Sequence, residues 1–384
     1  MKFLMAVSAI DIAEKPLATR FWWSLFRALS DMGHELTVVP FLGRSIESDW
    51  WRPLENPSRR LSSLIYSQGK NLSRSSGVRA FYAAHYEKAI SVPRLIISRN
   101  WRINIEKFLK ERGRVDVIVF FSVPINLLSD IPSQLNEKWD IPSVYYEGDM
   151  PEILPSFGGI HFSYYVDANL SQFRGFLSNS SGVRETLTAM GAKNVETLHW
   201  AVDPRDYSPI EDGKDTDVFF SGGSSRFRHE WMRRMIAEPA RQLPMKRFAV
   251  SGRPEQKFEN VRKLGFLEFA DWKRQICKSS ICLNISRTPH AATGGTSTTR
   301  VFELASLGAC VVSNPHKGMD DWFQPRKEII VLGEDDHPEE VYDWLLGSPG
   351  LMHELGSRAK DRVLAQHTYE HRATELMNYL HEVL

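Results

Sequence analysis

Glycine and hydroxyl residues that lead into a helical pattern form the strongest chemical signal in this sequence. The run TGGTSTTRVFELASLGACVVS occupies residues 293–313, and its apolar residues repeat at helical spacing from Val301 onward. Backbone N–H groups at a helix start can hold phosphate oxygens, and side-chain hydroxyls add further donors. The hydroxyl residues at this start are Ser297, Thr298 and Thr299. The pattern therefore predicts an anion site.

Two charged residues follow in the same helical pattern and fit a nucleotide. Arg300 supplies a fixed positive charge and a fork of donors suited to diphosphate oxygens. Glu303, one turn further, can accept hydrogen bonds from ribose hydroxyls. A plainer alternative stays open at this point. A hydroxyl would cap the helix, and Arg300 would pair with Glu303 on a solvated face.

Two further turns in the same half of the chain carry glycine and arginine. In SGGSSRFR, Gly222 and Gly223 follow a predicted strand and let the backbone approach a ligand closely, while Arg226 can neutralise its charge. In SGRPE, Arg253 follows the next predicted strand. The alternative for each is a turn with a surface arginine. Several such elements in one half favour a bound ligand.

In the first half of the chain, YYEGDMP ends a predicted strand with two carboxylates, Glu147 and Asp149. A carboxylate at this edge of a sheet can orient an acceptor hydroxyl or take its proton, and we assign that catalytic role to Asp149. The alternative is that Asp149 is only a turn residue before a proline. Weaker candidates are Asp11, His161 and His199.

An aspartate pair raises the question of a metal, because an Asp-x-Asp pair can hold a divalent cation that binds a diphosphate. Asp215 and Asp217 have this spacing, but they lie in a polar linker just before a predicted strand. We interpret them, and the acidic run at residues 334–336, as solvated turns. The sequence therefore predicts no metal site.

Short apolar runs alternate with amphipathic helical patterns along the chain, which is typical of an α/β fold with parallel strands. One series opens at residues 3–7 and a second at the VFFSGG run, and a Pro-rich linker near residues 204–216 joins them. The pattern predicts two doubly wound, Rossmann-like domains that face a central cleft. The predicted ranges are 1–204, with an elaboration at about 43–100, then 205–367, and a terminal helix at 368–384.

A basic segment lies within the first predicted domain. The chain carries 48 Lys plus Arg against 47 Asp plus Glu, a balance that argues against a globally basic nucleic-acid binder. Residues 52–114, however, hold fourteen basic and four acidic residues, 14 − 4 = +10, interleaved with aromatic residues. The pattern predicts only short helices here, near 79–89 and 103–112. The segment fits an acceptor or an anionic membrane surface, or else a solvated face with snorkelling side chains.

The three cysteines and the N-terminal residues indicate the cellular compartment of the protein. Cys277, Cys282 and Cys310 lack CxxC spacing and are expected to be buried thiols in a reducing compartment. The first residues have too short an apolar stretch for a secretory signal, and no later run has the length of a membrane span. We therefore expect a cytoplasmic protein, with peripheral membrane contact as an option.

Residues 265–336, from GFLEFADWK to GEDD, resemble the C-terminal domain of group 1 glycosyltransferases of the GT-B fold, and are most similar to the spore-maturation-type branch. Weaker resemblance extends over most of the chain from Leu177 onward. The resemblance implies that Glu303 binds the ribose of the donor, that residues 297–300 lie at its diphosphate, and that Gly222 and Gly223 form the turn beneath the phosphates. Asp149 is similar in place to an acidic residue of the first domain in this branch.

The resemblance implies transfer of a sugar from a nucleoside diphosphate sugar of the UDP, GDP, ADP or dTDP type. The acceptor would be a hydroxyl on a glycan, a lipid-linked or a small-molecule acceptor, and no tightly bound cofactor or metal is expected. One departure is that many group 1 enzymes carry a glutamate eight positions before the ribose glutamate, where this chain has Gly295. Two other functions stay open: a non-catalytic nucleotide-sugar scaffold or sensor, and a sugar-nucleotide epimerase or hydrolase.

Overall fold

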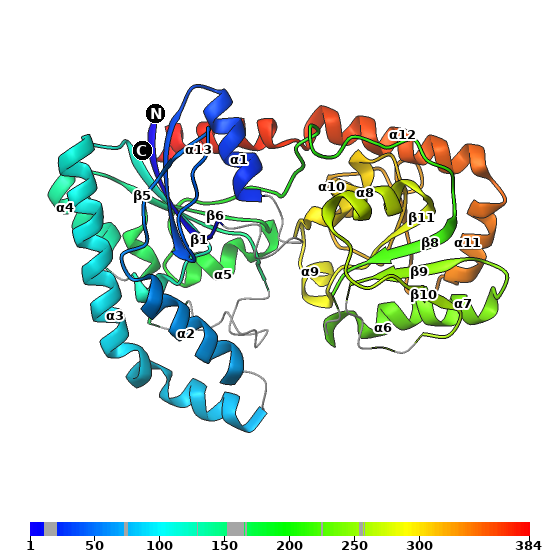
Figure 1. Ribbon diagram of the computed structural model, residues 1–384, viewed down its shortest axis with the longest axis horizontal. Helices are drawn as coiled ribbons and strands as arrows, with labels where there is room; N and C mark the ends of the chain where they lie inside the picture. Colours follow the sequence, from blue (N-terminus) through cyan, green and yellow to red (C-terminus); the bar gives the residue numbers. More distant parts are fainter. Residues whose placement is uncertain are drawn as a thin grey trace. The chain divides into compact units, whose positions relative to one another are not determined.

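The computed structural model describes residues 1–10, 21–72, 76–128, 130–151, 165, 167–223, 226–252, 256 and 258–384, without the side chains of residues 21 and 68–89. The chain forms two compact units (Figure 1). The first holds Trp22–Leu198 with the N-terminal strand and Ala373–Leu384, and the second holds His199–Arg372. Each unit is a parallel sheet covered by helices, so the predicted α/β class with two Rossmann-like domains is confirmed.

The first domain is built on a seven-stranded sheet in the order β3-β2-β1-β4-β5-β6-β7, and every neighbouring pair is parallel. The chain order reverses between β1 and β4, which makes the sheet doubly wound. Near-continuous apolar runs form the central strands because helices cover both of their faces. The strands are β1 (Lys2–Ala9), β2 (Glu35–Leu42), β3 (Arg52–Pro53), β4 (Val117–Phe121), β5 (Ser143–Glu147), β6 (Gly175–Ser178) and β7 (Val195–Thr197).

The helices predicted near residues 79–89 and 103–112 are both present, but they are parts of one longer helix. The structure has α2 (Arg59–Leu72) and then one helix of 37 residues, α3 (Ser76–Arg112), which continues through Pro93. Buried side chains recur on one face of α3 on both sides of the proline, so packing outweighs the lost hydrogen bond. Among the described residues, no helix combines the length and apolarity needed to cross a bilayer. The other helices of this domain are α1 (Phe21–Asp31), α4 (Ile131–Trp139) and α5 (Arg184–Ala189).

The last helix, α13 (Tyr369–Val383), begins in the second unit and continues in the first. Its Tyr379 hydroxyl donates a 2.7 Å hydrogen bond to the Asn194 carbonyl, and a Cβ on Gly175 would lie 1.9 Å from the Tyr379 Oη. Only glycine in β6 therefore lets the helix dock there. The terminal helix was predicted as a separate segment at 368–384, and most of it packs on the first domain.

The second domain is a six-stranded parallel sheet in the order β10-β9-β8-β11-β12-β13. Its strands are β8 (Thr216–Ser221), β9 (Phe248–Ser251), β10 (Val261–Lys263), β11 (Ser279–Asn284), β12 (Cys310–Ser313) and β13 (Ile330–Val331). Its helices are α6 (His229–Met232), α7 (Glu238–Gln242), α8 (Phe269–Cys277), α9 (Thr288–Ala292), α10 (Thr299–Ser306), α11 (Pro338–Leu346) and α12 (Pro349–Gln366). One π-helical turn, Arg233–Ala237, joins α6 to α7.

The core of the second domain contains all three cysteines as free thiols. Cys277 ends α8, while Cys282 and Cys310 lie in the neighbouring strands β11 and β12. Burial raises the pKa of Cys310 to about 12 and the pKa of Cys282 further. The predicted burial of the thiols is confirmed.

Candidate functional site

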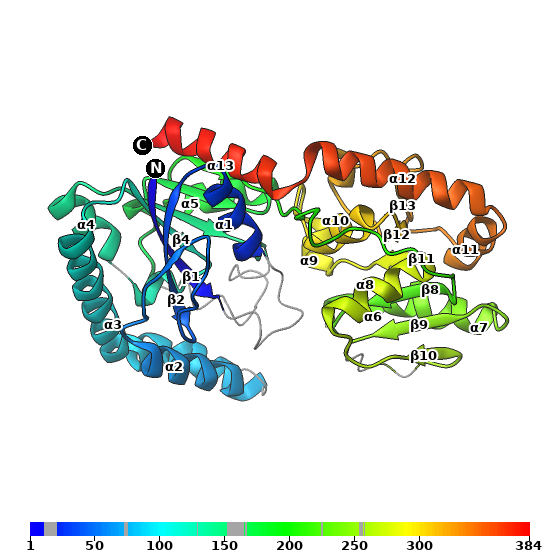
Figure 2. The same ribbon diagram turned by 45° about the horizontal axis from the view of Figure 1, so that its top comes forward.

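The loops that leave four strands of the second domain lie at one edge of its sheet. Because β9, β8, β11 and β12 are parallel neighbours, their carboxyl ends meet there. Helices α9 and α10 both follow β11 before β12 begins, and α9 lies at one end of the sheet (Figure 2). The helix α10, with its candidate phosphate and ribose residues, therefore starts at the same edge as the glycine turns.

The two glycine turns pack against each other through their backbones. Gly252 has φ +106°, and a Cβ on it would lie 2.4 Å from the Gly222 carbonyl oxygen. Below them, the Ser251 hydroxyl donates a 2.8 Å hydrogen bond to the Ser221 hydroxyl. Gly223 is exposed, and a Cβ on it would meet nothing within 4 Å. Among the described residues, nothing covers the Cα of Gly223, so a ligand can approach the backbone at that position.

The arginines near the first glycine turn differ in their surroundings. Arg226 is exposed, and its guanidinium lies 4.6 Å from the centre of the Phe227 ring. Arg228 instead donates to the Ile285 carbonyl at 2.8 Å and to the Gly223 carbonyl at 3.2 Å, so it ties the loop after β8 to the loop after β11. The candidate Arg253, like Asp11 and His161, lies outside the described residues.

Within the part of the chain that the structure describes, the Thr298 and Thr299 hydroxyls at the start of α10 are without partners. Thr298 is the N-cap residue, in an extended conformation, and its side chain makes no capping hydrogen bond. Thr298 and Thr299 are half-buried, and no hydrogen bond to either side chain is found among the described residues. Ser297 differs, because it is fully buried and its hydroxyl accepts a 2.9 Å hydrogen bond from the Trp200 N–H. Ser297 thus anchors the chain beneath the helix start.

Glu303 and Arg300 form the ion pair that the plainer alternative predicted, but not on a solvated face. Arg300 Nη1 lies 3.1 Å from Glu303 Oε2, and Glu303 is only 7% exposed. The other oxygen, Oε1, accepts a 2.7 Å hydrogen bond from the buried Tyr207 hydroxyl. The Arg300 guanidinium lies 4.6 Å from the centre of the Trp272 ring. These four side chains, called the α10 cluster below, hold Glu303 and Arg300 in fixed positions.

Tyr207 and Trp272 were not among the predicted site residues. Tyr207 lies in the predicted linker, where nothing in the spacing indicates that it folds back onto α10. Trp272 is on α8, which the sequence shows only as an amphipathic helix. An aromatic residue one turn into a helix is more often core than ligand contact, and both residues are indeed in the core of the second domain.

A buried polar network joins the loops after β11 and β12. The Ser286 N–H donates to the Asn314 side chain at 2.8 Å, and His316 lies 3.1 Å from the Ser286 hydroxyl and 2.9 Å from the Thr296 carbonyl. Burial lowers the pKa of His316 to about 4, so the imidazole is neutral at pH 7. A neutral His316 donates to the Thr296 carbonyl and fixes the loop that leads to α10. Sequence reasoning missed this network.

The first domain has a buried carboxylate at the end of β5. The Ser122 hydroxyl donates a 2.8 Å hydrogen bond to Glu147 Oε1, and the Tyr145 and Tyr165 hydroxyls lie 3.2 and 3.4 Å from Oε2. Burial, with a smaller contribution from Asp149, raises the pKa of Glu147 to about 7. Asp149 is half-buried, and its N–H donates to Glu147 Oε1 at 3.2 Å. Glu147 therefore shapes the turn that presents Asp149.

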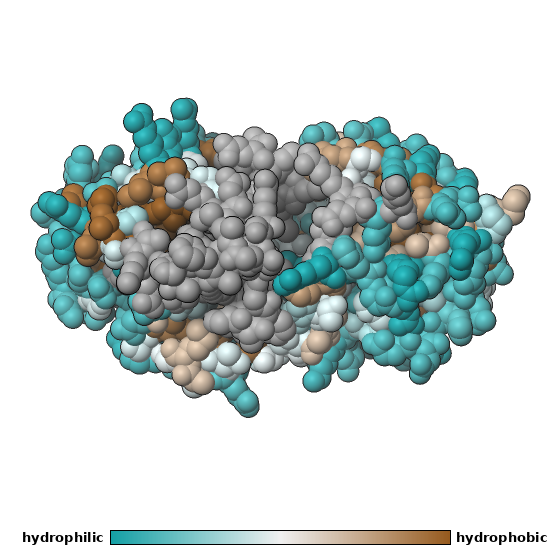
Figure 3. Space-filling view, turned by 90° about the horizontal axis from the view of Figure 1, so that it is seen from below, coloured by the Kyte–Doolittle hydropathy of each residue, from teal (hydrophilic) through white to brown (hydrophobic). Residues whose placement is uncertain are grey.

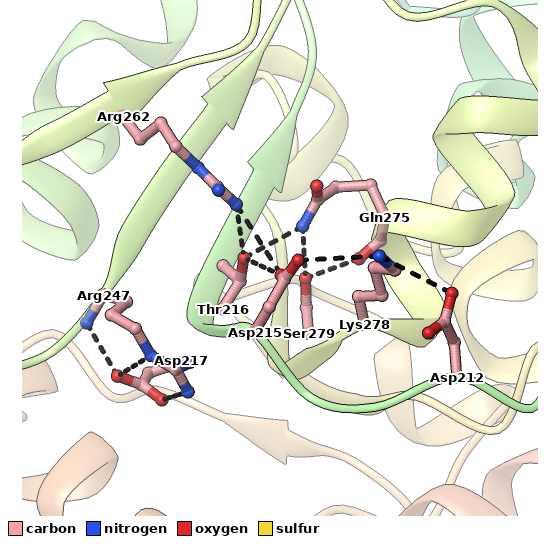
Figure 4. Close-up of polar contacts among 9 residues, drawn as sticks. All are labelled: Asp212, Asp215, Thr216, Asp217, Arg247, Arg262, Gln275, Lys278 and Ser279. Atoms are coloured by element: carbon pink, nitrogen blue, oxygen red, sulfur yellow. Dashed lines mark hydrogen bonds and ion pairs between the residues drawn. The ribbon is translucent and has the colours of Figure 1, made fainter.

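The aspartate pair considered for a metal lies at the amino end of β8, opposite the glycine turns. Asp217 accepts a 2.7 Å contact from Arg247, and Asp215 lies 3.7 Å from both Arg262 and Lys278 (Figure 4). The hydrogen bond from the Thr216 hydroxyl, with Arg262 and Lys278, lowers the pKa of Asp215. The hydrogen bonds from Arg247 outweigh the effect of burial and lower the pKa of Asp217. Among the described residues, no cluster of three or more His, Cys, Asp or Glu could hold a metal ion. The pair belongs to an exposed ion-pair cluster.

The second domain has a recognisable sequence family. Residues 228–378 match the family model described as glycosyl transferase-like. The match contains Arg300 and Glu303 of α10, Trp272 of α8 and the network around His316, while Tyr207 lies outside it. The match supports the predicted enzyme class, because it shows that the second domain is similar to glycosyl transferases. No protein with a curated description matches the sequence.

Solved structures with the same fold extend the likeness to the whole chain. Sucrose-phosphate synthase from Thermosynechococcus elongatus is 10% identical with a TM-score of 0.67, over 100% of this chain and 99% of that chain. HepE of Anabaena, solved in complex with UDP, is 12% identical with a TM-score of 0.62 over 100% of both chains. An E. coli protein described as trehalose-6-phosphate bound with UDP-2-fluoro glucose has 12% identity and a TM-score of 0.67, over 100% of this chain and 99% of that chain. The fold is therefore GT-B, as predicted.

Proposed function

We propose that this chain transfers a glycosyl group from a nucleoside diphosphate sugar to an acceptor hydroxyl. The bond between the anomeric carbon and the β-phosphate oxygen breaks, a bond from that carbon to the acceptor oxygen forms, and the acceptor proton leaves to a base. The nucleoside diphosphate departs with an added negative charge. The α10 cluster and the open helix start next to it are the observation that carries this proposal.

The charge on the departing diphosphate can be held without a metal. The N–H groups of the first turn of α10, the Thr298 and Thr299 hydroxyls and the Arg300 guanidinium are donors that are already in place. Ser297 supports them from below through Trp200. Gly222 and Gly223 offer bare backbone at the same edge, with Arg226 and, by its place in the sequence, Arg253 as further cations. We propose that these residues bind the diphosphate.

Two carboxylates have separate roles in this proposal. Glu303 accepts hydrogen bonds from the ribose hydroxyls, using lone pairs that its contacts with Tyr207 and Arg300 leave open. Asp149 takes the proton of the acceptor hydroxyl or orients that hydroxyl. The buried Glu147 supports Asp149 through the backbone hydrogen bond between them.

The donor nucleotide is proposed to be UDP, because HepE, which shares the fold, is described in complexes with UDP and with UDP-glucose. The acceptor is proposed to be a glycan, a lipid-linked or a small-molecule acceptor. The donor sugar is proposed to depend on the position of Gly295, where many group 1 enzymes carry a glutamate. Gly295 has φ +57°, and a Cβ on Gly318 would lie 2.6 Å from its nitrogen. A glutamate rarely adopts this conformation, so the sugar must be held by other residues here.

We also propose that the chain belongs to the spore-maturation-type branch of the group 1 glycosyltransferases. The resemblance of residues 265–336 to that branch supports this assignment.

Calorimetric titration with UDP, GDP, ADP and dTDP, with and without magnesium, tests the donor site. We expect the wild-type protein to bind one of them without magnesium, and Glu303→Ala to weaken that binding about 10- to 100-fold through the lost ribose contacts. Unfolding midpoints of both proteins show whether the variant still folds. Failure of every nucleotide to bind the folded wild-type protein would overturn the donor site.

Donor consumption distinguishes glycosyl transfer from the two other functions, which are a scaffold or sensor and an epimerase or hydrolase. A scaffold or sensor would bind the nucleotide but release no nucleoside diphosphate with any acceptor. An epimerase or hydrolase would consume donor without an added acceptor. Transfer requires that release of nucleoside diphosphate depends on the acceptor.

A matched substitution tests whether the α10 cluster positions Glu303. Tyr207→Phe removes only the hydroxyl that donates to Glu303 Oε1. We expect this variant to reduce the ratio of the affinity for UDP to the affinity for 2′,3′-dideoxy-UDP by about 2- to 10-fold. The affinity for the dideoxy nucleotide, which lacks the ribose hydroxyls, should change less. Equal losses for both nucleotides would instead mean that Tyr207 acts only on general stability.

We also propose that the basic segment at residues 52–114 contacts an anionic membrane surface from the cytoplasmic side, where a lipid-linked acceptor would lie. The aromatic residues that suggested this contact are not all available, because Trp101 is fully buried. Aliphatic and basic side chains on α3 take their place at the surface. Alanine at Arg59, Arg60 and Arg74 is expected to reduce binding to liposomes.

A further inference from the structure

Helix α3 has apolar side chains on two opposite faces. Ile97, Trp101 and Ile105 are at most 1% exposed and pack into the core of the first domain. The opposite face, offset from them by about half a turn, carries large aliphatic side chains in contact with solvent. These are Val92 (63% exposed), Leu95 (70%), Ile96 (46%) and Ile103 (50%). A helix that only covers a sheet has a polar outer face, so this second apolar stripe needs another explanation.

Basic residues continue the same stripe. Arg99 follows Ile96 by three residues and Lys110 follows Ile103 by seven, spacings that keep both on this face. Arg60 of α2 borders it, because Arg60, Ile96 and Asn100 line one cavity of about 540 Å³. Within the described part of the chain, Arg60, Arg99 and Lys110 make no hydrogen bond or ion pair. We call Val92, Leu95, Ile96, Arg99, Ile103 and Lys110 the α3 stripe.

Acidic residues are scarce around the α3 stripe. Between Pro57 and Ile105 the sequence contains a single acidic residue, Glu87. Of the two glutamates that follow on α3, Glu106 pairs with Lys138 at 2.7 Å and Glu111 with Lys107 at 3.8 Å. Free cations beside exposed aliphatic side chains are complementary to a surface that is anionic outside and apolar beneath. Figure 3 shows hydrophobic residues in brown gathered over the first domain, with hydrophilic residues on their outer side.

We infer that the α3 stripe lies in the plane of an anionic lipid surface, with Leu95 and its aliphatic neighbours below the headgroups and Arg60, Arg99 and Lys110 at the phosphates. This inference rests on the membrane contact proposed above and narrows it to one helix face. The binding is interfacial, because the opposite face of α3 belongs to the core of the first domain. Lysine and arginine stems can reach the headgroups while the helix stays in the interface.

Co-sedimentation of the full chain with lipid vesicles tests whether the α3 stripe binds an anionic lipid surface. The probes are vesicles of phosphatidylcholine alone and of phosphatidylcholine with phosphatidylglycerol, each at low and high salt. We expect binding to the anionic vesicles that salt weakens, and an approximately tenfold loss with Leu95→Asp or Ile103→Asp. Arg99→Glu should cause a similar loss on anionic vesicles only.

Matched controls lie on the second domain. Leu364→Asp replaces an exposed leucine on α12, 38% exposed, and Arg241→Glu replaces an exposed arginine on α7. Both should bind vesicles as the wild type does. Unfolding midpoints equal to the wild-type value show that each variant is folded.

The outcomes separate this inference from the broader proposal. Wild-type binding that is unchanged by the stripe substitutions, but lost on alanine at Arg59, Arg60 and Arg74, would overturn the stripe and leave the membrane contact standing. No wild-type binding to either vesicle would overturn both. A wild-type dimer that Leu95→Asp splits, seen by light scattering in the absence of lipid binding, would assign the stripe to self-association instead. None of these results depends on nucleotide binding.

Discussion

Arg300→Met is expected to weaken the binding of UDP, and of a UDP-sugar donor, by about 10- to 150-fold. The substitution removes a fixed charge that we place at the diphosphate, and a hydrogen bond to a charged group contributes about 1.5–3 kcal/mol. Methionine keeps an unbranched stem against Trp272, so the packing there changes little. The measurement is calorimetric titration, followed by the rate of donor turnover.

Two controls distinguish the loss of a nucleotide contact from a general loss of stability. Arg300 also pairs with the buried Glu303, so the unfolding midpoint of the variant must be measured beside its affinity. Arg241→Met, on the exposed surface of α7, gives the cost of removing an arginine elsewhere in the same domain. Equal nucleotide affinities for the wild type and a folded Arg300→Met variant would remove Arg300 from the donor site and restore the simple structural ion pair.

Glu147→Gln is expected to change how the stability of the first domain depends on pH. The folded-state pKa of Glu147, about 7, is above its ordinary value of 4.5, so the folded protein holds this proton at a pH where the unfolded chain has lost it. The wild-type protein therefore loses stability as the pH rises from about 5 to 8. A shift of 7 − 4.5 = 2.5 pKa units corresponds to up to about 3 kcal/mol. Glutamine resembles the protonated acid and does not titrate, so that part of the pH dependence should vanish.

Urea unfolding of both proteins across this pH range gives the difference in free energy of unfolding. Infrared spectroscopy gives a second readout, because a protonated carboxyl has a carbonyl band that should be present at pH 6, fade above pH 7 and be absent from Glu147→Gln. A constant difference in stability between pH 5 and 8, with no such band, would mean that Glu147 is ionised in the fold.

The sequence predicted the two sheets well because buried parallel strands have a clear sequence pattern. Strands such as β4 and β12 are apolar runs too short for helices and bounded by turn residues, so their type follows from length and composition alone. The basic elaboration was different. Pro93 and the many polar residues there argued against a long helix, and only the contacts of Trp101 and its neighbours with the sheet make α3 continuous.

The candidate site was predictable to the extent that its residues follow strand ends. The predictions for Gly222, Gly223 and Arg300 rest on the parallel sheet, which brings the ends of its strands together. Tyr207 and His316 were missed because their partners are distant in sequence: Tyr207 reaches Glu303 across 96 residues. Nor does local spacing tell that Ser297 is turned inward while Thr298 beside it is half-buried.

The three buried thiols give the second domain a reporter that the first domain lacks. All cysteines of the chain, Cys277, Cys282 and Cys310, are in the core that supports the candidate donor site, and burial keeps the strand thiols protonated at neutral pH. A thiol reagent therefore labels Cys282 and Cys310 only when this core opens. The rate of labelling measures the opening of the donor domain inside the intact protein, and any molecule that binds and stabilises that domain slows it in proportion.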